Sequence, residues 1–163
     1  MPELPHTRGC IVCGKENPHG LRAHLHIDER TGMVRCDFVP RAEHIGFEGI
    51  IHGGVLATLL DEAMVWAATW AGRRFCVCGE LNVRFRQAVS VGQRLRVEAK
   101  IISNRTRLIE TEGSVRDTGD KLLVSAEGKY VPVSPEQNRQ FVLTLVPEPQ
   151  TRQTLRELQG AGD

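Results

Sequence analysis

One long stretch of this chain has the spacing of an amphipathic helix, and it lies between segments that alternate as β-strands do. Apolar residues recur at intervals of three and four from Gly54 toward Gly72, which predicts a helix of about 17 residues. Such a helix must bury its apolar stripe against another element, and strands are the only partners that the pattern offers. The sequence therefore predicts a sheet packed around one helix.

We expect two strands before the helix and four after it, together forming an antiparallel sheet. They cover residues 21–28, 33–39, 80–89, 94–101, 107–117 and 122–133. The AspThrGlyAsp segment at 117–120 predicts a hairpin turn. An α+β chain in which a six-stranded antiparallel sheet wraps around one central helix has the hotdog fold.

A length of 163 residues suits one compact domain. We expect an N-terminal extension over 1–20, the hotdog domain over 21–133, and a C-terminal strand or tail over 134–163. The tail from Pro147 onward is polar, so we expect part of it to be mobile, with a short helical turn at 151–159.

Composition narrows the classes of partner. A net charge of +1 and only 5% aromatic residues argue against a nucleic-acid partner. No run approaches the roughly 20 apolar residues that span a bilayer, so we expect no membrane partner. The segment MPELPHTRGC lacks the features of a secretory signal, and the five cysteines are odd in number. We therefore expect a cytoplasmic protein with reduced thiols.

The triplet His52-Gly53-Gly54 stands where the chain turns into the helix. Free amides at a helix N-terminus bind phosphates or the negative charge that develops on a carbonyl oxygen. Glycine lets a ligand approach the backbone closely. The alternative is that the glycines only allow a tight loop, with His52 as a polar cap.

Asp61 lies on the same helix face as Gly54, beside the apolar stripe. A half-buried carboxylate there could act as a general base or nucleophile. The alternative is an ordinary helix Asp paired with Arg73 or Arg74 of another chain. Asp61 is seven residues from Gly54, about 10 Å along the axis at ~1.5 Å per residue. Both groups can act on one carbonyl only if a second subunit supplies the carboxylate, which predicts a two-fold dimer.

The segment HGGVLATLLDEAM resembles the helix signature of the hotdog acyl-CoA thioesterases, in the PaaI-like branch of the 4-hydroxybenzoyl-CoA thioesterase superfamily. CIVCGKENPHGL at 10–21 is similar to a Cys-x-x-Cys-Gly-x-x-Asn-Pro-x-Gly-Leu segment of many such proteins. IGFEGIIHGG and ELNVRFRQAVSVGQRLRVEAKI also match the family style. The resemblance spans residues 10 to 132.

The resemblance implies hydrolysis of an acyl-CoA thioester to free acid and coenzyme A, by a homodimer or a dimer of dimers. It implies Asp61 as general base or nucleophile, Gly53 as backbone donor to the thioester oxygen, and His52 as a group that orients the carbonyl, with Gly54 also binding substrate. Some relatives carry Asn or Gln in the loop before the His. Here His44 either takes that role or leaves it unfilled. No cofactor is expected, because coenzyme A is part of the substrate.

Two further patterns offer other chemistry. Cys10 and Cys13 could join Cys76 and Cys78 around zinc, but residues two apart on a strand seldom chelate one metal. Adding His6, His19 or His24 gives no clean tetrad, so we predict no metal site. Thiol redox chemistry lacks the βαβ context that usually follows such a pair.

A basic set near the strand ends could contact the phosphates of coenzyme A or form a solvated sheet face. Its members are Arg84, Arg86, Asn104, Arg105 and Arg107. We favour Asn104 and Arg105, in a predicted loop, as nucleotide contacts. Glu62 points about 100° away from Asp61 on the helix, which favours a salt-bridge role. Trp66 and Trp70 either form core or border an aromatic acyl pocket.

Two other functions compete with hydrolysis. A non-catalytic acyl-CoA binder of the same fold would need the amide site but not Asp61, and it would usually carry an effector domain, which 163 residues do not show. A hotdog dehydratase would need a His and a carboxylate arranged to move protons at carbon, and the nine-residue spacing from His52 to Asp61 suits that poorly.

Overall fold

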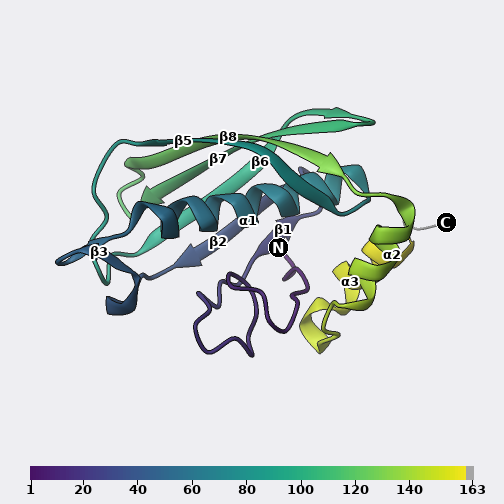
Figure 1. The fold of residues 1–163 in the computed structure, drawn as a ribbon, viewed down its shortest axis with the longest axis horizontal. Coiled ribbons are helices and arrows are strands. Elements are labelled where there is room, and N and C mark those ends of the chain that lie inside the picture. Colours follow the sequence, from purple (N-terminus) through teal and green to yellow (C-terminus); the bar gives the residue numbers. More distant parts are fainter. Residues whose placement is uncertain (161–163) are drawn as a thin grey trace.

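A computed structural model describes residues 1–160 of the chain, and it shows a six-stranded antiparallel sheet with one long helix across a face (Figure 1). The spatial order of the strands is β1-β2-β6-β7-β8-β5. The strands are β1 (His26–Asp28), β2 (Met33–Phe38), β5 (Cys76–Phe85), β6 (Leu95–Arg105), β7 (Leu108–Asp117) and β8 (Leu122–Pro132). The helix is α1 (Gly53–Gly72). The predicted hotdog fold is confirmed.

Helix α1 has clear boundaries. At its start the His52 side chain accepts the Gly54 amide, and its last residue is followed by Arg73 in the left-handed region, with φ 52°. The helix runs over 20 residues, three more than predicted. It begins one residue earlier, at Gly53, and continues to Gly72. Its buried stripe includes Leu60 and Met64, which face the sheet.

The sheet approaches α1 most closely where β7 and β8 carry glycine. A Cβ on Gly113 would lie 2.8 Å from Met64 Sδ and 2.9 Å from Leu60 Cδ2. A Cβ on Gly128 would lie 2.9 Å from Met64 Cε. All three distances are too short for a side chain at these positions, so glycine here sets the spacing between helix and sheet.

The first predicted strand is shorter than expected. Residues 21–25 keep the alternating burial of a strand, but their backbone bonds to the N-terminal extension instead of a sheet neighbour. The amide of Leu21 donates to Ile11 O at 2.8 Å, and that of Ala23 donates to Val12 O at 2.9 Å. Backbone hydrogen bonds therefore join residues 1–20 to residues 21–27 and make the extension an integral part of the fold.

The segment between β2 and α1 holds three short elements: the 3₁₀ turn η1 (Ala42–His44) and the two-stranded ribbon of β3 (Ile45–Phe47) and β4 (Ile50–Ile51). The hairpin at 117–120 is confirmed, with the Asp120 amide donating to Asp117 O. Strand β5 begins at Cys76, four residues earlier than predicted, and ends at Phe85.

The C-terminal segment is helical, so the expectation of a strand there is wrong, while the helical turn expected at 151–159 is confirmed. It forms α2 (Pro135–Leu143), the turn η2 (Pro149–Thr151) and α3 (Arg152–Gly160), beside the C-terminal end of α1 (Figure 1). Ser134 caps α2, and proline follows at its first position, which favours a helix start. Leu155 and Leu158 of α3 are buried. Residues 161–163 of the predicted tail lie outside the described residues.

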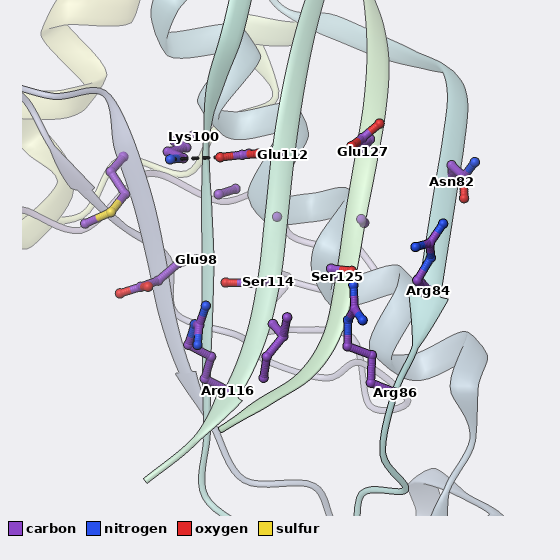
Figure 2. Close-up of a pocket in the computed structure, with 15 residues that line it drawn as sticks. Asn82, Arg84, Arg86, Glu98, Lys100, Glu112, Ser114, Arg116, Ser125 and Glu127 are labelled. Carbon is purple, nitrogen blue, oxygen red and sulfur yellow. Dashed lines mark ion pairs between the residues drawn. The ribbon is translucent and has the colours of Figure 1, made fainter. Parts of the chain in front are cut away.

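The outer face of the sheet, away from α1, is polar (Figure 2). Alternation along β7 turns Ile109, Thr111, Gly113 and Val115 toward the core, so the residues between them face outward. Outward side chains from β5, β6, β7 and β8 line a shallow trough of about 490 Å³ with both signs of charge, where Lys100 pairs with Glu112 at 2.8 Å. In the described part of the chain, none of the helices has the length and apolar character that would take it across a membrane.

Candidate active site

The head of α1 presents one free amide. The Gly54 amide donates to His52 Nδ1 at 2.8 Å, and the Val55 amide donates to His52 O at 3.0 Å. Among residues 1–160 the Gly53 amide has no hydrogen-bond partner. Because the positive end of the helix dipole adds to this donor, Gly53 is suited to an oxyanion. The structure thus assigns Gly54 to the His52 cap and leaves Gly53 as the available donor.

An apolar pocket of about 410 Å³ opens beside the Gly53 amide. It lies between the β3–β4 ribbon, the first turn of α1 and the end of β5. Its apolar lining comprises Phe47, Ile50, Ile51, Leu56, Phe85, Ala88 and Val89, and the polar side chains of Arg86 and Gln87 also line it. Phe47 is 83% exposed and Phe85 is 52% exposed, which is unusual for large apolar side chains. This pocket is suited to an apolar group attached to a carbonyl at Gly53.

Close packing as well as access favours glycine at residue 53. A Cβ at residue 53 would lie 3.2 Å from the Phe85 ring. The glycine therefore lets the aromatic ring and a ligand share the space above the helix head.

Asp61 is half-buried on α1, and a residue of the sheet forms a hydrogen bond with its carboxylate. Tyr130 Oη on β8 donates to Asp61 Oδ1 at 2.9 Å. Burial, and then the Asp61 carboxylate, raise the pKa of Tyr130 well above its usual range, so the phenol stays protonated and acts as the donor. Burial and Asp61 also raise the pKa of the Cys78 thiol. Sequence reasoning missed Tyr130 as a site residue; its only signal was an inward position in the last strand.

The His44 ring is buried and already engaged. The Arg41 amide donates to His44 Nδ1 at 3.1 Å, Arg41 Nη2 lies 3.4 Å from His44 Nε2, and the ring stacks on Phe38. Burial, followed by the Arg41 charge, lowers the pKa of His44. The backbone carbonyl of His44 accepts the His52 amide at 2.9 Å. His44 thus supports the helix head through its backbone, while its ring points to Arg41 and Phe38.

Asn104 and Arg105 lie in strand β6, so the expectation of a loop is wrong: β6 continues four residues beyond its predicted end and the turn follows at 106–107. Asn104 Nδ2 donates to Ala71 O at 3.1 Å, at the C-terminal end of α1. Eighteen residues separate Ala71 from Gly53, so this end is about 27 Å from the free amide at ~1.5 Å per residue. Within one chain these residues are remote from the pocket.

The predicted basic set is divided between two regions. Arg84 and Arg86 line the trough on the outer sheet face (Figure 2), and Arg86 also lines the pocket beside Gly53. Asn104, Arg105 and Arg107 gather at the hairpin between β6 and β7. The described structure does not bring the two groups together in one chain.

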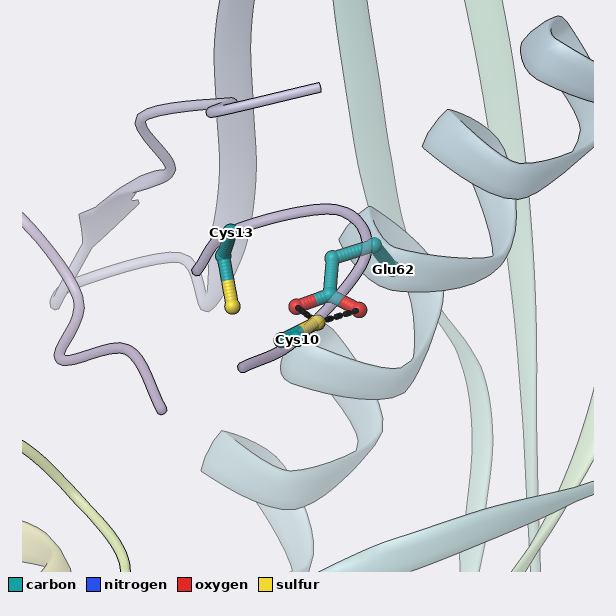
Figure 3. Close-up of side chains that lie close together, drawn as sticks. All are labelled: Cys10, Cys13 and Glu62. Atoms are coloured by element: carbon teal, nitrogen blue, oxygen red, sulfur yellow. Dashed lines mark hydrogen bonds between the residues drawn. The ribbon is translucent and has the colours of Figure 1, made fainter. Parts of the chain in front are cut away.

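Glu62 has a different environment from the predicted one. Within residues 1–160 it forms no ion pair; its carboxylate instead accepts a 3.1 Å hydrogen bond from Trp66 Nε1 and lies against the thiol of Cys10 (Figure 3). Burial raises the pKa of Glu62 to about 7. Trp66 and Trp70 are both buried core residues, which favours the core interpretation over the aromatic pocket.

Part of the chain is similar to a known family. Residues 48–124 match the family model described as the thioesterase superfamily, a span that includes the helix head, Asp61 and the pocket-lining end of β5. This stretch of the chain, from the start of the helix head to the first residues of β8, is similar to the thioesterase superfamily. The match covers β4, α1, β5, β6 and β7 in full and the start of β8.

A solved structure of a thioesterase superfamily protein is 30% identical, with a TM-score of 0.71, over 76% of this chain and 63% of that one. The PaaI protein of the E. coli phenylacetic acid degradation operon is 18% identical, with a TM-score of 0.60, over 64% of this chain and 75% of that one, and shows the fold alone. An Archaeoglobus fulgidus protein named "Putative esterase" is 24% identical over 63% of this chain. This chain spans 66% of that curated relative, slightly less than two thirds of its length.

Proposed function

We propose that this chain hydrolyses an acyl-CoA thioester to the free acid and coenzyme A. The observation that carries the proposal is the unpartnered Gly53 amide at the head of α1, beside an apolar pocket of about 410 Å³. A thioester needs both features, because its carbonyl requires a donor and its acyl group requires an apolar surface.

The proposed chemistry uses two groups. The thioester oxygen accepts the Gly53 amide, which stabilises the oxyanion as the carbonyl carbon becomes tetrahedral. The Asp61 carboxylate takes a proton from water as the water oxygen bonds to that carbon. Collapse of the intermediate breaks the carbon–sulfur bond, and the proton goes to the departing thiolate. Tyr130 orients the carboxylate through its hydrogen bond to Oδ1.

We further propose that the two groups come from different subunits. Gly53 and Asp61 are eight residues apart, about 12 Å at ~1.5 Å per residue. Strand β5 is an edge strand of the sheet, and Val77 and Phe85 on it are exposed in the single chain. Pairing two β5 edges across a two-fold axis extends the sheet, relieves the open edge and sets the two α1 helices antiparallel. That arrangement carries the Asp61 of one subunit toward the Gly53 of the other.

The same arrangement gives Asn104 and Arg105 a role. Ala71, which Asn104 contacts, is ten residues beyond Asp61. In an antiparallel pair this places the partner's Asn104 about 15 Å past the Gly53 amide, outside the helix head. We propose that these residues bind the coenzyme A portion, while the Phe47 and Phe85 side chains favour an aromatic or medium-length acyl group.

A thiol-release assay over short, medium, long and aromatic acyl-CoA thioesters tests the proposal, with Asp61→Asn as the informative variant. Asp37→Asn, which changes an exposed carboxylate on β2, is the matched control. We expect turnover to fall at least 10²-fold in Asp61→Asn alone, with acyl-CoA binding retained. Full activity in Asp61→Asn would overturn the role of that residue. Binding without turnover across the panel would replace hydrolysis by an acyl-CoA-binding function.

A further inference from the structure

Two thiols of the N-terminal extension meet a carboxylate of α1. Cys10, Cys13 and Glu62 each offer one ligand atom, and these atoms all lie within 4.8 Å of one another (Figure 3). Cys10 Sγ is 3.9 Å from both Glu62 oxygens. The cluster joins residues 52 positions apart in the sequence, so the fold and not local spacing produces it.

The loop that carries the two thiols folds back so that its amides donate to Cys10. The Val12 amide donates to Cys10 Sγ at 3.3 Å, and the Gly14 amide donates to Cys10 O at 3.0 Å. A Cβ on Gly14 would lie 2.5 Å from Cys10 O, so the tight turn requires glycine. An amide that points at the sulfur stabilises a thiolate.

An N–H donor also holds the Glu62 carboxylate in position. Trp66 Nε1 fixes one Glu62 oxygen at 3.1 Å, and among residues 1–160 no basic side chain pairs with Glu62. Even a partly buried carboxylate without a counter-charge is destabilising unless it is protonated or bound to a cation. Two thiols with one fixed carboxylate form a set that suits a borderline-soft divalent ion.

We propose that Cys10, Cys13 and Glu62 bind one Zn²⁺ ion, with the fourth position open to water. Tetrahedral zinc with bonds of about 2.3 Å to sulfur and 2.0–2.2 Å to oxygen needs ligand atoms roughly 3.5–3.8 Å apart. The 3.9 Å between Cys10 Sγ and the Glu62 oxygens is within a few tenths of an ångström of that requirement. Binding leaves both sulfurs as thiolates and Glu62 as a carboxylate, the protons that these three groups carried go to solvent, and the complex of charge −1 is stabilised by the Val12 and Trp66 N–H donors.

This site is independent of the proposed hydrolysis, but it has a structural consequence for it. The ion ties the N-terminal extension to the middle of α1, one residue from Asp61. The bound ion would therefore fix the position of the N-terminal extension relative to the helix face that carries Asp61. Sequence spacing could not find the site, because the third ligand is a helix Glu that only the fold brings to the cysteines.

Metal content and cobalt binding test the proposal directly. The full chain, purified without chelator, is assayed for zinc by elemental analysis. The demetallated chain is then titrated with Co²⁺, whose thiolate charge-transfer bands report sulfur coordination. The variants are Cys10→Ser, Cys13→Ser and Glu62→Gln, with Cys78→Ser as the control for an exposed thiol outside the cluster. Circular dichroism of each demetallated variant confirms that it is folded before titration.

We expect one equivalent of zinc per chain in the wild type and in Cys78→Ser. Either cluster cysteine variant should lose at least tenfold in Co²⁺ affinity and about half of the charge-transfer intensity. Glu62→Gln should lose affinity while keeping the full thiolate bands. Substoichiometric zinc together with weak Co²⁺ uptake would overturn the proposal. So would unchanged binding in folded Cys10→Ser and Cys13→Ser, or wild-type thiols that are isolated as a disulfide.

Discussion

Tyr130 on β8 donates a 2.9 Å hydrogen bond to Asp61 on α1, so the sheet orients the carboxylate that the helix presents. Tyr130 is completely buried, and its phenol has no exposure through which water could replace this contact. The orientation of Asp61 is thus fixed from the core side, which leaves its other face available to a ligand.

Replacing Tyr130 with Phe removes this donor and preserves the ring. We expect the free energy of unfolding to fall by about 1.5–3 kcal/mol, the usual contribution of a hydrogen bond to a charged group. We also expect a lower kcat with little change in KM, because Asp61 loses its orientation and not its charge. Urea unfolding and steady-state kinetics measure the two effects. An unchanged kcat in a folded Tyr130→Phe protein would show that the contact is only structural.

The Gly53 amide can be removed while the backbone shape is kept. Proline lacks an N–H and is favoured at the first position of a helix, and the extended His52 that precedes it, with ψ 130°, suits a residue before proline. Gly53→Pro should therefore fold and lose about 10²–10³-fold in kcat.

Gly53→Ala is the control for that variant. It places the same Cβ beside the Phe85 ring but keeps the N–H. We expect Gly53→Ala to retain most of the activity that Gly53→Pro loses. Equal losses in the two variants would show that crowding at Phe85, and not the amide, limits turnover.

Gly113 lies where β7 meets α1. In Gly113→Ala the new methyl group would lie under 3.0 Å from both Met64 and Leu60, which are fully buried. We expect overpacking to lower the free energy of unfolding by about 1–3 kcal/mol. Gly119→Ala, in the exposed β7–β8 hairpin, is a matched control in which the nearest atom lies 3.3 Å away. Equal stability of the two variants in urea would contradict a close helix–sheet approach at Gly113.

The stability of the protein should depend on pH through His44. Its pKa in the folded state is lowered from 6.5, by burial and by Arg41, although Glu43 opposes this. The unfolded chain therefore binds the proton more readily. This contribution to stability is present above pH 6.5 and is lost as the pH falls toward the lowered value.

In His44→Asn the amide oxygen can still accept the Arg41 amide, but the residue does not titrate. We expect a flatter fall in stability below pH 6.5 in this variant than in the wild type, measured by denaturant unfolding at several pH values. Parallel pH profiles for the two proteins would contradict this assignment.

The overall fold could be predicted from the sequence because its signals are local. The single run of apolar residues at helical spacing identified α1, and alternation identified the strands that surround it. The short β1 was misjudged because residues 21–25 alternate in the same way whether they pair with a sheet or with the N-terminal extension. The C-terminal segment was expected as a strand or tail because its helices are short and polar outside a few positions such as Leu155 and Leu158.

The site could be predicted only in part. Gly53 and Asp61 were found because a helix fixes their spacing. The position of Tyr130 beneath Asp61, and of Cys10 and Cys13 beside Glu62, depends on contacts between residues more than 45 positions apart, which no local pattern encodes. Asn104 was placed in a loop because β6 continues through a bulge near Ser103 that interrupts its alternation.

The most direct test of the composite site is a mixed dimer of Asp61→Asn and Gly53→Pro chains, isolated with two different affinity tags. One site of that dimer combines an intact Gly53 with an intact Asp61 from the other chain, and the second site has both lesions. We predict roughly half of the wild-type turnover per dimer, although each homodimer is nearly inactive. A mixed dimer as inactive as its parents would contradict the account, because Gly53 and Asp61 would then act within one chain or not act together.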